Sequence, residues 1–141
     1  MGFFRSKKKS EVNDPNNMSP LEALTHLFAA IQIADNIASY EEKESWISAI
    51  TQLFPEHSEE RAEKYFSEAH DALSIQNDVE RKSYITDVLK RLKHLLSDEQ
   101  INSIGPLIAD IVEADGIVMT SEMKIVALSE EILNIKIKVE D

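Results

Sequence analysis

From residue 19 onward, apolar residues recur every three or four positions, the spacing that places side chains on one face of an α-helix. Most of these apolar runs follow a residue that commonly caps a helix N-terminus. The predicted caps are Ser19, Ser39, Ser58, Asn77 and Ser97. We therefore expect an all-α fold, a compact bundle of about six to seven helices, within residues 19–134.

Prolines set two of the predicted helix boundaries. Pro55 ends the second helix, because proline cannot continue the backbone hydrogen-bond ladder. The pair Gly105-Pro106 predicts a break that separates a short helix capped by Ser97 from another helix ending near Ala114. A last helix is expected over about residues 120–133.

The N-terminal end of the chain lacks a helical pattern. Residues 1–18 are expected to form a flexible basic arm, because residues 1–9 hold four basic side chains and no acid, and the polar stretch that follows offers no packing face. Two interpretations stay open. The arm is a solvated tail, or it makes a reversible contact with an anionic membrane surface, into which Phe3 and Phe4 insert.

The C-terminal residues 135–141 show a different pattern. Ile135, Ile137 and Val139 alternate with lysines at a period of two, which is typical of a strand. Nothing else in the chain resembles a strand, so we expect an extended tail laid against the helices.

Composition narrows the classes of function. The 141 residues include 26 acidic and 15 basic ones, a formal net charge of −11, which argues against a nucleic-acid partner because duplex binding needs cations to neutralise phosphates. The absence of cysteine excludes disulfides, thiolate metal sites and a cysteine nucleophile. The apolar runs are too short to cross a bilayer, and the N-terminus does not resemble a secretory signal. We expect a cytoplasmic protein, at the inner membrane surface if the arm docks there.

Motifs of catalysis are not found in the sequence. The four histidines show no metal-ligand spacing, and no Gly-x-Ser-x-Gly elbow or other nucleophile beside a base occurs. We therefore expect no enzymatic activity and no catalytic residues.

A nine-residue segment occurs twice. Residues 34–42 and 114–122 share alanine, aspartate, isoleucine and a final glutamate at the same four positions. Asn36 in the first copy stands opposite Gly116 in the second, and these are the two residue types that best tolerate the left-handed conformation after a helix. The repeat predicts the same helix–turn–helix corner built twice.

Each corner carries two carboxylates. Asp35 and Asp115 follow helix C-termini, where the partial negative charge of free carbonyls disfavours them, and Glu42 and Glu122 fall in the first turn of the next helix. Two explanations stay open. The carboxylates accept hydrogen bonds from free N–H groups of the next helix, as Glu42 would in a capping box with Ser39, or they bind a divalent cation such as Ca²⁺ or Mg²⁺.

The segment Ala114-Asp115-Gly116-Ile117-Val118 with Glu122, and its copy at residues 34–42, resembles the signature of the TerB-like (tellurite-resistance) family over roughly residues 20–133. Asn36 departs from the usual glycine of that signature. The resemblance implies an all-α fold of two related antiparallel helical halves that share a core. It also implies a role in bacterial tellurite-resistance and stress-response systems, often near the membrane, and a metal site. The implied ligands are Asp35, Glu42, Asp115 and Glu122.

The sequence thus favours a non-enzymatic TerB-like module that acts through protein partners and a divalent cation. The alternative is a metal-free interaction scaffold docked loosely at the membrane by residues 1–9. The sequence determines neither the physiological partner nor the oligomeric state.

Overall fold

The computed structural model describes residues 14–34, 40–113 and 120–139, with the side chains of residues 40–45 left aside. Over these ranges the chain is all-helical, as predicted, with no strand. A short 3₁₀ helix, η2, covers Pro15–Asn17. The six α-helices are α1 (Pro20–Ala34), α2 (Tyr40–Leu53), α3 (Glu59–Ser74), α4 (Asp78–Leu95), α5 (Asp98–Glu113) and α6 (Thr120–Leu133).

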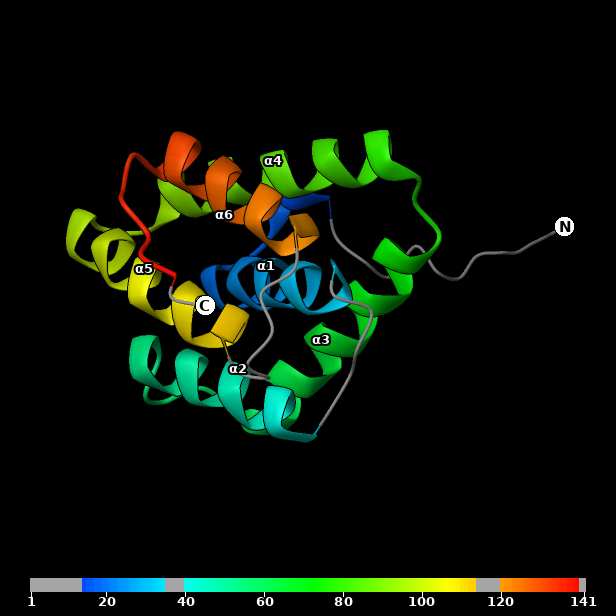
Figure 1. Cartoon of the computed structure of the whole chain (residues 1–141). Helices are drawn as coiled ribbons and strands as arrows, with labels where there is room; N and C mark the ends of the chain where they lie inside the picture. The colour runs from blue at the N-terminus through cyan, green and yellow to red at the C-terminus, as the bar shows by residue number, and fades with distance from the viewer. Residues whose placement is uncertain (1–13, 35–39, 114–119, 140–141) are drawn as a thin grey trace, which may run out of the picture.

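Helix α1 forms the centre of the bundle (Figure 1). Every side chain from Glu22 to Gln32 is buried, and α1 contacts all five other α-helices. A helix that is buried on all its faces must be surrounded by other elements, because otherwise its apolar side chains would meet water. The other helices therefore pack around α1 rather than forming two separate layers.

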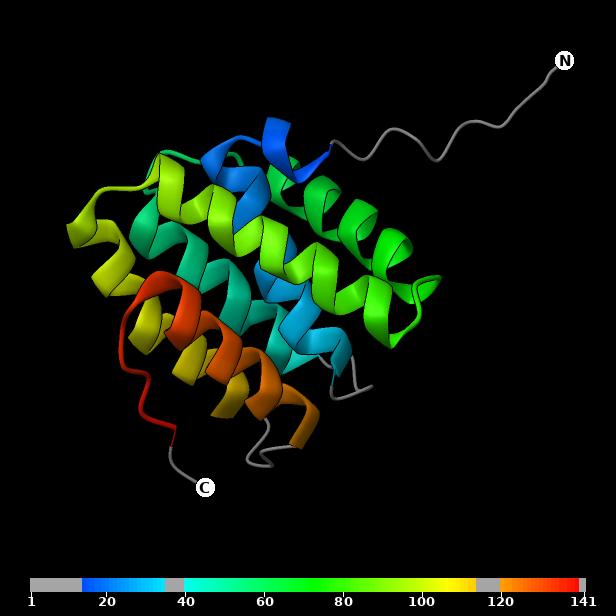
Figure 2. The same cartoon turned by 90° about the horizontal axis from the view of Figure 1, so that it is seen from above.

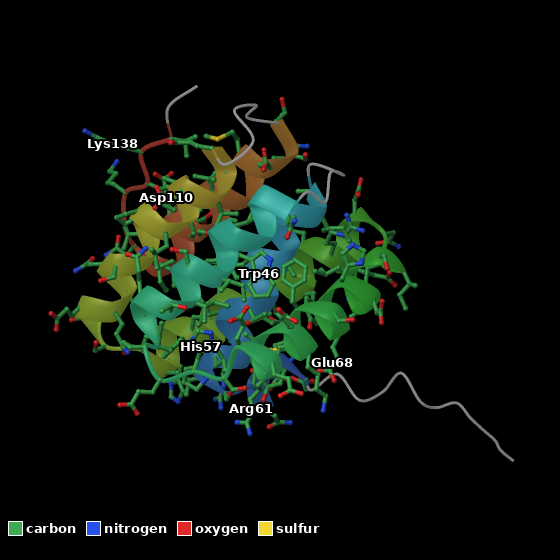
Figure 3. All side chains as sticks on the ribbon, turned by 90° about the horizontal axis from the view of Figure 1, so that it is seen from below. Trp46, His57, Arg61, Glu68, Asp110 and Lys138 are labelled. Atoms are coloured by element: carbon green, nitrogen blue, oxygen red, sulfur yellow. The ribbon has the colours of Figure 1, made fainter. Side chains whose placement is uncertain are left out.

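Helices α4 and α6 lie side by side on one side of α1 and run in the same direction (Figures 1 and 2). Helices α2 and α5 also contact each other. On the α2 and α3 side, the rings of Trp46 and Phe66 stack with centroids 4.2 Å apart and planes 9° from parallel. Figure 3 shows Trp46 near the middle of this side. The stack joins α2 to α3.

Four of the five predicted caps are confirmed, since each side-chain oxygen accepts a hydrogen bond from the backbone N–H three residues later. The confirmed caps are Ser19, Ser58, Asn77 and Ser97. Two of them are capping boxes, in which Glu80 and Gln100 accept a bond from the backbone N–H of the cap residue in return. The fifth, Ser39, lies outside the described residues.

The predicted break at Gly105-Pro106 is wrong, and so is the separate helix it implied. Helix α5 is continuous, with Pro106 inside it on the exposed face. Ile104 and Ile108, on the two sides of the proline, are both fully buried. Their burial holds the two halves of α5 on one core, which offsets the hydrogen bond that proline cannot make.

The C-terminal segment crosses α5 at Gly105. Asn134 ends α6 in the left-handed conformation, with φ of 60°, and residues 135–139 then continue without helix. A Cβ atom at Gly105 would lie 3.2 Å from the Lys136 carbonyl oxygen, so glycine permits this close approach. The backbone N–H of Ile137 donates to the Glu130 carboxylate at 2.8 Å, and the Ile137 side chain is buried.

The packed part of the chain begins before Ser19, whereas the sequence placed residues 14–18 in the flexible arm. Pro15 and Met18 are buried, Met18 completely. The Arg91 Nε donates to the Met18 carbonyl oxygen at 2.9 Å, which ties this segment to α4. The stretch looked polar in the sequence because its two buried side chains are separated by exposed asparagines.

Candidate functional site

The helix ends fall where the repeated corners were predicted. Helix α1 ends at Ala34 and α2 begins at Tyr40, while α5 ends at Glu113 and α6 begins at Thr120. Of the four predicted ligands, Asp35 and Asp115 lie outside the described residues. Glu42 is in the first turn of α2, but its side chain is outside the described part of the structure. Glu122 is the one whose side chain is described.

The structure places the start of the first repeat in contact with the end of the second repeat. The Ser121 Oγ donates to the Ala34 carbonyl oxygen at 2.6 Å, joining residues 87 positions apart. Ala34 immediately precedes Asp35, and Ser121 immediately precedes Glu122. The last residue of α1 and the first turn of α6 are thus held in contact by a hydrogen bond.

Glu122 lies in the first turn of α6, as the sequence predicted, and its side chain is buried to 1% exposure. Burying a carboxylate costs free energy unless it has polar or cationic partners, and Glu122 does take part in such an interaction. Its position in the first turn of α6 also favours negative charge, because the free N–H groups of the turn carry partial positive charge. Glu122 is therefore part of the protein interior.

A groove lies beside this corner, between α4 and α6. We call it the α4–α6 groove: it is lined from α4 within residues 78–85, from α6 within residues 121–131, and at one end by Ile33 and Ala34. Its volume is about 770 Å³. The size falls in the range of sites that hold a small molecule or a short peptide segment.

A buried histidine and a half-buried tyrosine form a second polar feature of the structure. The Nδ1 of His26 lies 2.6 Å from the Tyr84 Oη, linking α1 to α4, and His26 is 1% exposed. Burial lowers the pKa of His26 to about 4. The pKa of Tyr84 is raised, mainly by burial and further by the negative charges of Glu22 and Asp14. The pair is therefore neutral at pH 7.

Sequence reasoning missed both the groove and this pair. His26 lies in a long run of residues that are all buried, so no local contrast distinguishes it from the apolar residues around it. The groove combines residues from three helices that are distant in the sequence. One signal was present, since Arg81 and Lys82 fall near the start of α4, where acidic residues are usual.

Among residues 14–34, 40–113 and 120–139, no three acidic or histidine side chains are grouped as a metal site. In the same ranges, no helix has the length and apolar content needed to cross a bilayer. Comparison of the chain with known protein families, curated protein sequences and solved structures finds no match.

Proposed function

We propose that this protein is a non-enzymatic, TerB-like module of bacterial stress-response systems that binds a divalent cation where its two corners meet. The proposed ligands are Asp35, Glu42, Asp115 and Glu122. The site would be built of carboxylate oxygens, which Ca²⁺ and Mg²⁺ prefer. A cytoplasmic location and protein partners belong to the same proposal.

The hydrogen bond from Ser121 to Ala34 is the observation that carries the proposal. It joins Ala34 of the first copy to Ser121 of the second, and each of these residues is next in sequence to a proposed ligand, Asp35 or Glu122. Without that contact, each corner would offer only two carboxylates, fewer ligands than these ions need. The resemblance also implied an all-α fold, and the described residues are all-helical.

The direct test is isothermal titration of the protein with Ca²⁺, Mg²⁺ and Zn²⁺. We expect saturable binding of at least one of these ions, lost in the double variant Asp35→Asn with Asp115→Asn. An ion at 100 times its Kd should also stabilise the native state by about 2.7 kcal/mol, measured as a shift of the unfolding curve.

The matched control is Asp87→Asn with Asp110→Asn, which removes two exposed carboxylates from α4 and α5. Figure 3 shows Asp110 on α5. The control should bind the ion like the unmodified protein. Heats that are the same in all three proteins would contradict the metal site, because nonspecific attraction to an acidic surface would then explain them.

A metal-free scaffold docked at a membrane is the second candidate. The observation that favours it is the hydrogen bond from Arg91 to Met18, because it attaches the segment that follows the basic N-terminal residues in sequence to α4. In this case the corners serve only to cap helices, and partner proteins are recruited to the membrane surface.

A further inference from the structure

The α4–α6 groove has an apolar floor between polar walls. Ile85 of α4 and Ile125 of α6 form the buried part, at 4% and 7% exposure. Leu128 and Ile33 are half-buried and line the groove above them. These residues offer an apolar strip that a partner could cover, gaining free energy in proportion to the apolar area removed from water.

The charge of the groove is opposite to that of the whole protein. Its lining holds three cationic side chains, Arg81, Lys82 and Lys124, and two acidic ones, Asp78 and Glu131, although the chain as a whole carries −11. The cations come from both walls. A ligand in the groove would therefore find a local excess of positive charge on an otherwise acidic protein.

The two lysines are available to a ligand. Lys82 and Lys124 are exposed, and neither ammonium group is paired with a carboxylate within the described part of the chain. Arg81 already forms a hydrogen bond within the protein, since its guanidinium donates to the Leu73 carbonyl oxygen at 2.7 Å. That bond fixes the Arg81 side chain in place, while the lysines remain free to adjust to a partner.

Two large apolar side chains are exposed near the N-terminus of α4. Ile75 and Val79 are the most exposed large apolar side chains among the described residues, at 82% and 79% exposure. Val79 precedes Lys82 by three positions on α4, so the two side chains are neighbours on the helix surface. Exposed apolar side chains next to an apolar groove are typical of a protein-binding surface.

We propose that the α4–α6 groove binds an amphipathic helix of a partner protein whose apolar face is flanked by carboxylates. The groove runs along α6 from residue 121 to residue 131, about 15 Å, which matches about three turns of a docked helix. Apolar side chains at positions i, i+3 or i+4, and i+7 would cover Ile125 and Leu128, and the carboxylates would pair with Lys82 and Lys124. This binding does not depend on the ion proposed for the corners.

A second copy of the chain is a less suitable occupant. Two molecules of charge −11 repel each other at moderate ionic strength, whereas a short acidic segment with few charges experiences the local field of the groove. A basic peptide fits the total charge of the protein but would place like charges opposite both groove lysines. The two kinds of peptide therefore give opposite expectations, which makes the proposal testable.

The test is selection of a random 16-residue peptide library, displayed on phage, against the full-length protein. We expect the enriched peptides to have helical apolar spacing and more acidic than basic residues. The Kd of a synthetic enriched peptide should rise about tenfold in the variant Lys82→Glu with Lys124→Glu. The control, Lys64→Glu with Lys138→Glu, changes the total charge equally at exposed positions outside the groove and should leave the Kd unchanged.

Three outcomes of the peptide experiments would overturn the proposal. These are no enrichment, enrichment of basic peptides, and a Kd that the groove variant and its control change equally. Light scattering of the protein alone completes the test, because a dimer that the groove variant dissociates would show that a second copy occupies the groove instead. Circular dichroism of both variants verifies that the exposed substitutions leave the fold intact.

Discussion

At the scale of single residues, the interior contains polar side chains among the apolar ones. His26 is fully buried in α1 and bonded to Tyr84 through Nδ1, while its Nε2 has no partner among the described residues. Burial disfavours the charged imidazolium, which is why the pKa of His26 falls to about 4 from 6.5. The stability of the fold is therefore linked to pH through this residue.

The sign of that linkage follows from the two pKa values. Between pH 6.5 and 4 the unfolded chain binds a proton at His26 that the folded chain does not, so stability is complete above this window and falls as the pH drops through it. At pH 5 the loss should be about 2 kcal/mol relative to pH 7.5. Urea unfolding at both pH values measures it.

The variant His26→Gln isolates this contribution, because glutamine is polar but does not titrate. Its free energy of unfolding should depend less on pH than that of the unmodified protein, by the same amount of about 2 kcal/mol. The variant His94→Gln, which removes an exposed histidine of α4, should keep the full dependence. An equal pH dependence in all three proteins would show that other groups cause it.

At the scale of elements, local hydrogen bonds determine where helices begin, whereas tertiary contacts determine whether a helix continues through a proline. The N-terminal caps of α1, α3, α4 and α5 were read correctly because each depends on a hydrogen bond within four residues. The continuation of α5 through Pro106 was not predicted, because burial of the apolar face of α5 on the core outweighs the local preference of proline. Pro106 therefore lowers the free energy of unfolding, and a substitution at this position can remove that effect.

We expect Pro106→Ala to stabilise the protein by about 2 kcal/mol. Alanine restores a backbone hydrogen bond and relieves the proline ring clash, an effect of roughly 3 kcal/mol, while the more flexible unfolded chain takes back up to about 1 kcal/mol. Pro106 is exposed, so no packing is lost. The free energy from denaturant unfolding gives the value.

The control on the same helix is Ser103→Ala, another exposed position. Its change should stay within about 0.5 kcal/mol, the difference in helix propensity. A destabilised Pro106→Ala variant would mean that the proline sets a bend which α5 needs in order to reach both α2 and the C-terminal segment.

At the scale of the whole molecule, positive charge gathers locally at several places on an acidic protein. The basic residues near the N-terminus and the cations of the α4–α6 groove are two of them. Uniform negative charge repels anionic surfaces, so any attachment to a membrane must come from such a local cluster. The second functional candidate depends on the N-terminal cluster alone.

Co-sedimentation with vesicles rich in phosphatidylglycerol tests this dependence. The full chain should sediment at low ionic strength, and the binding should decrease as salt is raised, because each basic residue near an anionic surface contributes only about 1 kcal/mol. A protein in which Arg5, Lys7, Lys8 and Lys9 are all changed to glutamine should remain in the supernatant. Equal sedimentation of the two proteins would reject the membrane-docked scaffold.

The helical class and most helix boundaries could be predicted from the sequence alone, because apolar periodicity and caps act over three to seven residues. Tertiary structure alone decided that α1 is the central helix, that Met18 belongs to the core and that α5 continues through Pro106. It also decided that Ser121 meets Ala34, that Glu122 is buried and that α4 and α6 enclose a groove. These features join residues tens of positions apart, and their free energy comes from burial that no short stretch of sequence contains.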